Sequence, residues 1–201
     1  MSMWKAEFRT MTGEERAELC RMQGNLTRSS KPGVSSWLGR WFDRGRESND
    51  VLRQALLRDL QCGKVQVIHA TAAGAVRLAN PDGSLAGFFV DIGSGLVMFI
   101  ESREWDTRTG VPDFETLFPC SSFTLVRAPH SKVDLEFRCD GRPFGVSREV
   151  EVPSLEVLDA IIEDGDIMSG RLESLEDDFE RLILRSAPAP APASRIRIPS
   201  A

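Results

Sequence analysis

The residues with the clearest chemical potential form one short string, Val90-Asp91-Ile92-Gly93-Ser94-Gly95. An apolar run ends there in a carboxylate, and two glycines follow it. Glycine has no Cβ, so it lets the backbone approach a ligand closely, and it also takes the positive φ that a tight hairpin turn needs. The string therefore predicts either a cofactor-binding turn or the turn of a β-hairpin.

As a cofactor-binding turn, the string resembles the first motif of S-adenosylmethionine-dependent methyltransferases, where a glycine-rich turn joins a strand to a helix. The resemblance implies that Asp91, Gly93 and Gly95 contact the cofactor. It covers only residues 90–95, and Val97 stands where the fuller motif has a third glycine. The run from Leu96 to Ile100 is apolar and β-branched, which is typical of a strand. We therefore favour a hairpin over residues 85–100 at the centre of a small sheet.

The composition is that of an ordinary globular protein of 201 residues, with 41% hydrophobic and 27% charged residues. No apolar run approaches the ~20 residues that span a bilayer, and the first residues contain no apolar signal core. We therefore expect a soluble, cytoplasmic protein. The basic residues are mostly arginine, which favours a bacterial origin.

Charge is divided unevenly along the chain. Residues 1–64 have 12 Lys or Arg against 8 Asp or Glu, whereas residues 65–201 have 13 against 22. This asymmetry favours an internal or homodimeric contact between the two parts. Nucleic acid is an unlikely partner, because the basic residues alternate with acidic ones.

Metal and nucleophile chemistry has little support in the sequence. Cys20, Cys62, Cys120 and Cys139 are scattered without a Cys-x-x-Cys pair, so we expect free, largely buried thiols, with a bridge between Cys120 and Cys139 as the alternative. His69 and His130 are candidates for acid or base chemistry, but neither has a partner at a recognisable spacing, so a structural role is favoured for both. We expect no cofactor and no metal.

Two helices are predicted in the N-terminal part, residues 1–63. The first starts at Thr12, with Glu15 as the acid of a capping box, and ends at Gly24-Asn25. The second runs from Ser48 to Gln61 with an apolar stripe.

Between these helices lies a short segment with aromatic residues at helical spacing. It is predicted either to dock on the sheet or to bind a protein partner, since tryptophan and arginine are common at interface hot spots. Its candidate contact residues are Trp37, Arg40, Trp41, Phe42 and Arg44.

The remaining chain predicts a β-rich core at 64–152, an acidic helical extension at 153–186 and a disordered Pro/Ala-rich tail at 187–201. The core has six or seven short strands joined by tight turns, which indicates an antiparallel small barrel or bent sheet. The extension contains two predicted helices, one from Ser154 and one from about Ser169 to Arg185. The fold class is therefore α+β. The preferred function is a non-enzymatic interaction or regulatory module, and the alternative is a methyltransferase-like small-molecule enzyme.

Alanine substitution of Trp37 or Trp41 distinguishes the two interpretations of the aromatic segment. If either ring docks on the sheet, its loss should lower the free energy of unfolding by roughly 3–5 kcal/mol. If the rings bind a partner, denaturant unfolding should be unchanged and the complex should weaken by ~2 kcal/mol or more. We expect a stability loss at one or both positions; two variants that unfold as the wild type does would contradict docking.

Overall fold

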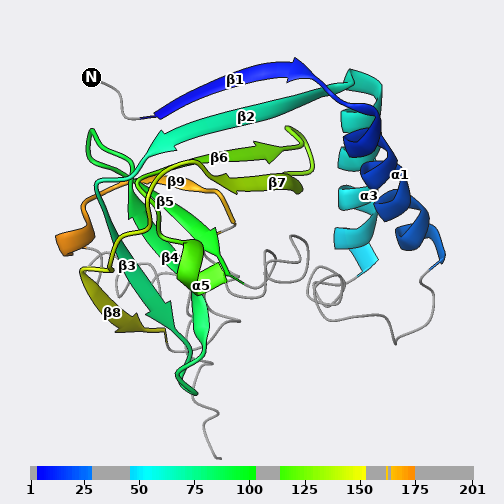
Figure 1. The fold of residues 1–201 in the computed structure, drawn as a ribbon. Helices are drawn as coiled ribbons and strands as arrows, with labels where there is room; N and C mark the ends of the chain where they lie inside the picture. The colour runs from blue at the N-terminus through cyan, green and yellow to red at the C-terminus, as the bar shows by residue number, and fades with distance from the viewer. Residues whose placement is uncertain (1–3, 29–45, 103–113, 153–161, 163, 175–201) are drawn as a thin grey trace, which may run out of the picture.

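The structure of the chain is a computed structural model that describes residues 4–28, 46–102, 114–152, 162 and 164–174. These residues form two long helices, two β-sheets and short helical turns (Figure 1). The predicted α+β class is confirmed. None of the described helices is both long and apolar enough to cross a membrane.

Helix α1 (Gly13–Arg28) begins where the sequence predicts. The Thr12 hydroxyl accepts a hydrogen bond from the Glu15 N–H at 3.2 Å, and the Glu15 carboxylate accepts one from the Thr12 N–H at 2.7 Å. These reciprocal bonds are a capping box. The predicted end at Gly24-Asn25 is wrong, because the helix continues beyond it. Leu26 packs with the apolar face of the helix, and this contact favours the extra turn over a glycine cap.

Helix α3 (Arg46–Cys62) confirms the second predicted helix, although it starts before the predicted cap at Ser48. It packs against α1 and against the turn that joins strands β6 and β7. The cluster contains Leu19, Met22, Leu52, Leu56, Ala128 and Val133. Asp59 fixes this contact: its buried carboxylate accepts hydrogen bonds from the backbone N–H groups of His130 and Ser131, both at 2.8 Å. His130 therefore lies in a structural turn.

Sheet A has four antiparallel strands in the order β1-β2-β6-β7. Their bounds are β1 (Trp4–Thr10), β2 (Lys64–Thr71), β6 (Ser122–Arg127) and β7 (Asp134–Cys139). The last three lie in the predicted β-rich core at 64–152. No element was predicted before Thr12, so β1 is an addition. Its residues are largely exposed on both faces, and the strand pairs with β2 along its whole length.

Sheet B has five strands in the order β8-β3-β4-β5-β9. Their bounds are β8 (Arg148–Glu151), β3 (Gly74–Ala79), β4 (Leu85–Asp91), β5 (Leu96–Glu101) and β9 (Ile167–Ser169). Strands β3 and β8 are parallel, and the other pairs are antiparallel. The predicted hairpin over residues 85–100 is therefore confirmed as β4 and β5. Its turn contains three residues with positive φ, Gly93 at 82°, Ser94 at 60° and Gly95 at 70°.

The two sheets enclose the main core, and they do not close into a barrel among the described residues. Residues of sheet A (Ile68, Phe123, Leu125) pack in one cluster with residues of sheet B (Phe88, Val90, Met98, Ile100). Phe114 of the short helix α5 (Phe114–Leu117) and Phe118 after it complete this cluster. The barrel form of the prediction is wrong, because strand pairing stops at β1 and β7 in one sheet and at β8 and β9 in the other.

The opposite face of sheet B is also buried, under chain that follows β8. Phe89 and Phe99 pack there with Ile162 and Leu172. Burial on both faces explains why β4 and β5 are almost continuously apolar.

The predicted C-terminal helices fall mostly outside the described residues, which exclude 153–161 and 175–201. A helical start near Ser169 is wrong, because Ile167–Ser169 is strand β9 and Leu172–Ser174 is a 3₁₀ turn, η1. The edge of β5 supplies backbone partners to β9, and pairing there overrides the helical spacing of the leucines.

A buried arginine connects sheet A to the segment that leads into β9. The Arg127 guanidinium of β6 lies 3.2 Å from the Asp134 carboxylate, and both side chains are almost completely buried. It also donates to the carbonyls of Asp164 and Gly165. A Cβ on Gly165 would lie 2.8 Å from this guanidinium, and the residue has φ +71°, so glycine is required there.

Arg127→Leu should lower the free energy of unfolding by about 3–5 kcal/mol, because it leaves the Asp134 carboxylate buried without its cation. Denaturant unfolding measures this loss. The matched control is Arg138→Leu, which removes an exposed arginine paired with Asp140 and should cost no more than about 1 kcal/mol. Equal losses in the two variants would contradict the central role of Arg127.

Candidate functional site

Strand β1 is one of the two edge strands of sheet A, and most of its residues are exposed. Among the described strands, β1 pairs with β2 alone. Residues Lys5 to Phe8 are exposed, and the Phe8 ring is 60% exposed. A strand in this position presents a row of backbone N–H and C=O groups on its outer edge. Such an edge has the backbone groups that an added extended segment would pair with.

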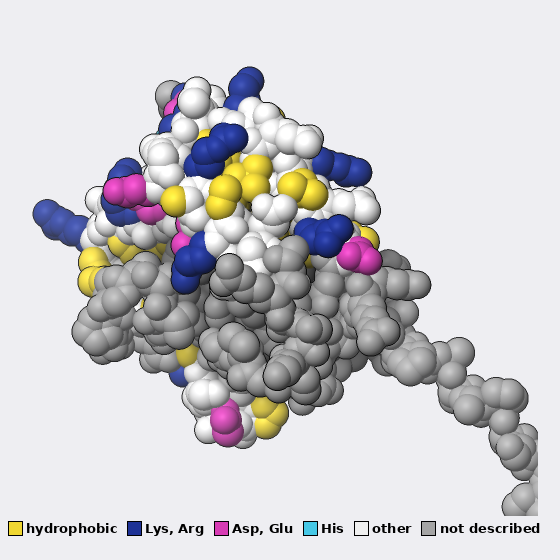
Figure 2. Space-filling model, turned by 90° about the vertical axis from the view of Figure 1, so that its right-hand side faces the viewer, with side chains coloured by type: hydrophobic (Ala, Val, Ile, Leu, Met, Phe, Trp, Pro, Cys, Tyr) yellow, Lys and Arg dark blue, Asp and Glu magenta, His cyan; other side chains and the backbone are white. Residues whose placement is uncertain are grey.

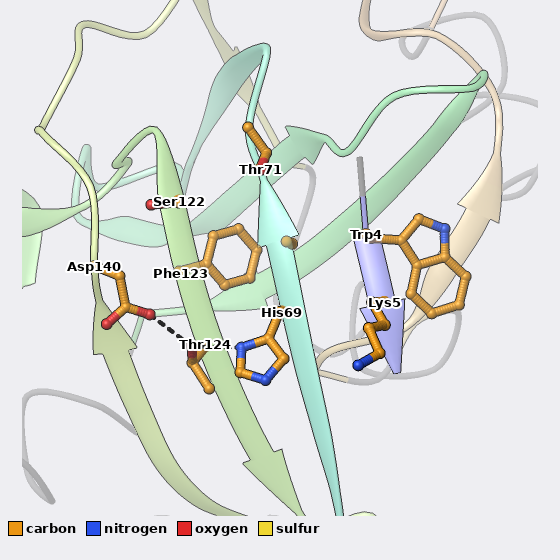
Figure 3. Close-up of a pocket in the computed structure, with 9 residues that line it drawn as sticks. Trp4, Lys5, His69, Thr71, Ser122, Phe123, Thr124 and Asp140 are labelled. Atoms are coloured by element: carbon orange, nitrogen blue, oxygen red, sulfur yellow. Dashed lines mark hydrogen bonds between the residues drawn. The ribbon is translucent and has the colours of Figure 1, made fainter. Parts of the chain in front are cut away.

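A row of polar side chains crosses the outer face of sheet A next to this edge. Strand register places Lys5 beside His69, His69 beside Thr124, and Thr124 beside Arg138. Figure 3 shows Lys5 and His69 on neighbouring strands, with Thr124 and Asp140 beyond them. The row comes from four strands, so the sheet register alone brings its members together.

The hydrogen bonds of this row fix the tautomer of His69. The Thr124 hydroxyl donates to the Asp140 carboxylate at 2.6 Å, and the same hydroxyl lies 3.1 Å from His69 Nδ1. A hydroxyl has one proton, so His69 Nδ1 must be the donor in the second bond. His69 Nε2 is then the acceptor nitrogen of the neutral ring, and it lies 3.9 Å from a Glu7 carboxylate oxygen.

Two carboxylates of the row are held in their charged form. The hydrogen bond from Thr124, helped by Arg138, lowers the pKa of Asp140 below its usual value. The hydrogen bond and charge of Lys5 lower the pKa of Glu7. At neutral pH the surface therefore presents fixed charges of both signs.

The row borders a shallow pocket of about 310 Å³. Its lining residues are Trp4, Lys5, His69, Ala70, Thr71, Ser122, Phe123, Thr124 and Asp140. His69 Nε2 could accept a proton or a hydrogen bond from a molecule bound there. Within the described part of the chain, no group of three or more His, Cys, Asp or Glu is placed to hold a metal ion.

The residues predicted for a methyltransferase-like site, Asp91, Gly93 and Gly95, form the turn between β4 and β5 of sheet B. The Asp91 carboxylate accepts a hydrogen bond from the Gly93 N–H at 2.7 Å, so it closes its own turn. The helix implied by the resemblance is absent, because Leu96 begins strand β5. The alternative partner-binding residues Trp37, Arg40, Trp41, Phe42 and Arg44 lie outside the described residues.

The cysteines differ from the prediction in their exposure. All four are free thiols, but Cys20 and Cys62 are exposed, so the expectation of largely buried thiols is wrong for these two. Cys120 is buried and lies close enough to Cys139 for the two thiols to hydrogen-bond. This bond, together with burial, raises the pKa of Cys139.

A second surface lies on the side of the molecule where α1 and α3 are found. Figure 2 shows apolar side chains there, surrounded by lysine and arginine. In α3, Val51 is 68% exposed and Leu57 is 36% exposed. Nothing in the described structure indicates what would cover these residues.

Sequence reasoning missed β1 and the Thr124–Asp140 pair as functional residues. The contact of Asp140 with Thr124 depends on the pairing of β6 with β7. The signal for β1 was the alternation of Lys5, Glu7 and Arg9 with Trp4, Ala6 and Phe8.

No protein-family model, curated protein or solved structure matches this chain.

Thr124→Val should release the neutral His69 ring from the Nδ1–H tautomer, because the hydroxyl that accepts its proton is removed. Nitrogen-15 shifts of the imidazole above its titration range report the tautomer. Thr124→Ser keeps the hydroxyl and should behave as the wild type does. An Nε2–H tautomer in the wild type would contradict the assignment.

Proposed function

We propose that this chain is a non-enzymatic interaction module that binds a protein partner through the outer edge of strand β1. The observation that carries the proposal is the position of β1 at the end of sheet A, with Lys5 to Phe8 exposed. Addition of a strand to an exposed sheet edge is a common mode of peptide recognition. Backbone hydrogen bonds supply the affinity, and alternate side chains supply the specificity.

The side chains of β1 favour a selective partner over general aggregation. Lys5, Glu7 and Arg9 alternate in sign on one face of the strand, so a neighbouring strand must present opposite charges at matching positions. On the other face, Phe8 offers an exposed aromatic ring for a cross-strand contact.

The cytoplasm is the compartment that we propose for the module. The exposed free thiols Cys20 and Cys62 support this placement, because a reducing compartment preserves such thiols. The segment with Trp37 and Trp41 stays a candidate second contact for a partner, as the alternative to its docking on the sheet. The methyltransferase alternative loses its main support, since a strand follows Gly95.

Phe8→Glu should remove partner binding and leave the fold intact, because the ring is exposed and lies at the edge of the sheet. The test is affinity capture from the native host, followed by a binding assay with the captured protein in purified form. We expect an affinity loss of roughly tenfold or more, with an unchanged unfolding midpoint.

The matched control is Val51→Glu, which places the same charge at an exposed apolar position of α3. It should bind the captured partner as the wild type does. A partner that binds wild type and Phe8→Glu equally would show that the β1 edge is not the binding surface.

A further inference from the structure

We propose that the strand bound at the β1 edge is β1 of a second copy of this chain, paired antiparallel about a two-fold axis through Ala6. The inference rests on the proposed function and names its partner. The two four-stranded sheets A would then join into one continuous sheet across the dimer. A two-fold axis makes both contact surfaces identical, so β1 must be complementary to itself.

The sequence of β1 is self-complementary in this register. Directly opposite residues of an antiparallel pair lie on the same face of the sheet. With Ala6 opposite its own copy, Lys5 lies opposite Glu7 of the second copy, and Glu7 lies opposite Lys5 of the second copy. On the other face, Trp4 of each copy lies opposite Phe8 of the other copy. Over residues 4–8, charged side chains thus lie opposite unlike charges and rings lie opposite rings, whereas Arg9 lies outside these charge pairs.

The charges needed for this pairing are exposed and already adjacent. Within one chain Lys5 Nζ lies 2.5 Å from the Glu7 carboxylate, and their side chains are 71% and 46% exposed. Two copies would bring four such groups together with alternating sign. Burial of an unpaired charge is costly. The proposed contact avoids this cost, because each of these charges lies opposite an unlike charge.

Neighbouring registers are less favourable. An axis through Glu7 would place Glu7 opposite itself and Lys5 opposite Arg9, so each directly opposite charged pair would repel. An axis through Phe8 would pair Glu7 with Arg9, but Arg9 is already bound to both oxygens of Glu15 at 2.9 and 2.6 Å. That bidentate bond connects β1 to the first turn of α1, and pairing about Phe8 would compete with it.

The position of β1 leaves space for the second copy. Figure 1 shows β1 along the outer boundary of the molecule, with β2 on its inner side and α1 beyond its C-terminal end. Ala6 is exposed and small, so a strand can approach it closely at the axis.

Charge reversal tests the register in the purified full chain. In Lys5→Glu, the new carboxylate of each copy lies opposite the Glu7 carboxylate of the other copy. In Glu7→Lys, the new ammonium group of each copy lies opposite the Lys5 ammonium group of the other copy. Each should raise the dimer Kd about tenfold or more, as measured by sedimentation across a concentration series. The double variant Lys5→Glu/Glu7→Lys restores opposite charges and should return the Kd to near the wild-type value.

Arg53→Glu is the control, because it makes the same charge change at an exposed position of α3. It should leave the Kd unchanged. A dimer that is insensitive to all the β1 variants would overturn the proposal, as would a protein that stays monomeric at every concentration.

Cysteine cross-linking tests the axis itself and detects a weak dimer. In a Cys20→Ser/Cys62→Ser background, Ala6→Cys places two thiols directly opposite each other, at a Cα separation within the range of a disulfide. Oxidised glutathione should link this variant rapidly and should link Lys5→Cys slowly. Faster linking of Phe8→Cys than of Ala6→Cys would assign the other register and overturn the proposal.

The failure of this inference is distinguishable from the failure of the proposed function. If no variant cross-links but a host protein still binds wild type and not Phe8→Glu, the edge recognises a different chain and only the second copy is excluded. If Phe8→Glu affects neither self-association nor capture, both proposals fail.

Discussion

The buried guanidinium of Arg127 is a polar contact on which the joining of the two sheets depends. It lies in β6 of sheet A, and its donors reach the carbonyls of Asp164 and Gly165, just before the strand that ends sheet B. The Gly165 N–H in turn donates to the carbonyl of Phe99 in β5. One cation thus joins a strand of one sheet to the border of the other. The Asp134 carboxylate offsets its charge where water is excluded.

This arrangement determines which surfaces remain accessible. Sheet A uses its inner face for the shared core, and sheet B is buried on both faces at β4 and β5. Helices α1 and α3 cover the turn between β6 and β7, where Asp59 binds two backbone N–H groups. In sheet A, the described structure leaves accessible the β1 edge, the polar row beside it and the opposite edge at β7, where Glu136 and Arg138 are exposed. The side chains that are available to contact another molecule are therefore those that do not pack in the core.

The sequence was sufficient for the elements whose signals are local. The capping box at Thr12 and Glu15 needs only residues within one helical turn, and the β4–β5 hairpin needs only a glycine turn between two apolar runs. It was not sufficient for features created by pairing. Strand β1 alternates apolar and charged side chains over only six residues, and it pairs with β2 along its whole length. Thr124 meets Asp140 only through the register of β6 and β7. The open form of the two sheets is a further result of pairing, since strand count alone does not decide closure.

An exposed edge strand normally invites open-ended aggregation, and the β1 sequence contains two restraints on it. A slip of one residue would place charged side chains opposite apolar ones, because side chains alternate between faces. A slip of two residues, to an axis at Glu7, places like charges opposite each other. In the proposed dimer, pairing about Ala6 would also use the outer edge of both β1 strands at once, so this contact would join no third copy. In the proposed dimer, the alternation of charge along β1 would therefore favour one register and limit the assembly to two copies.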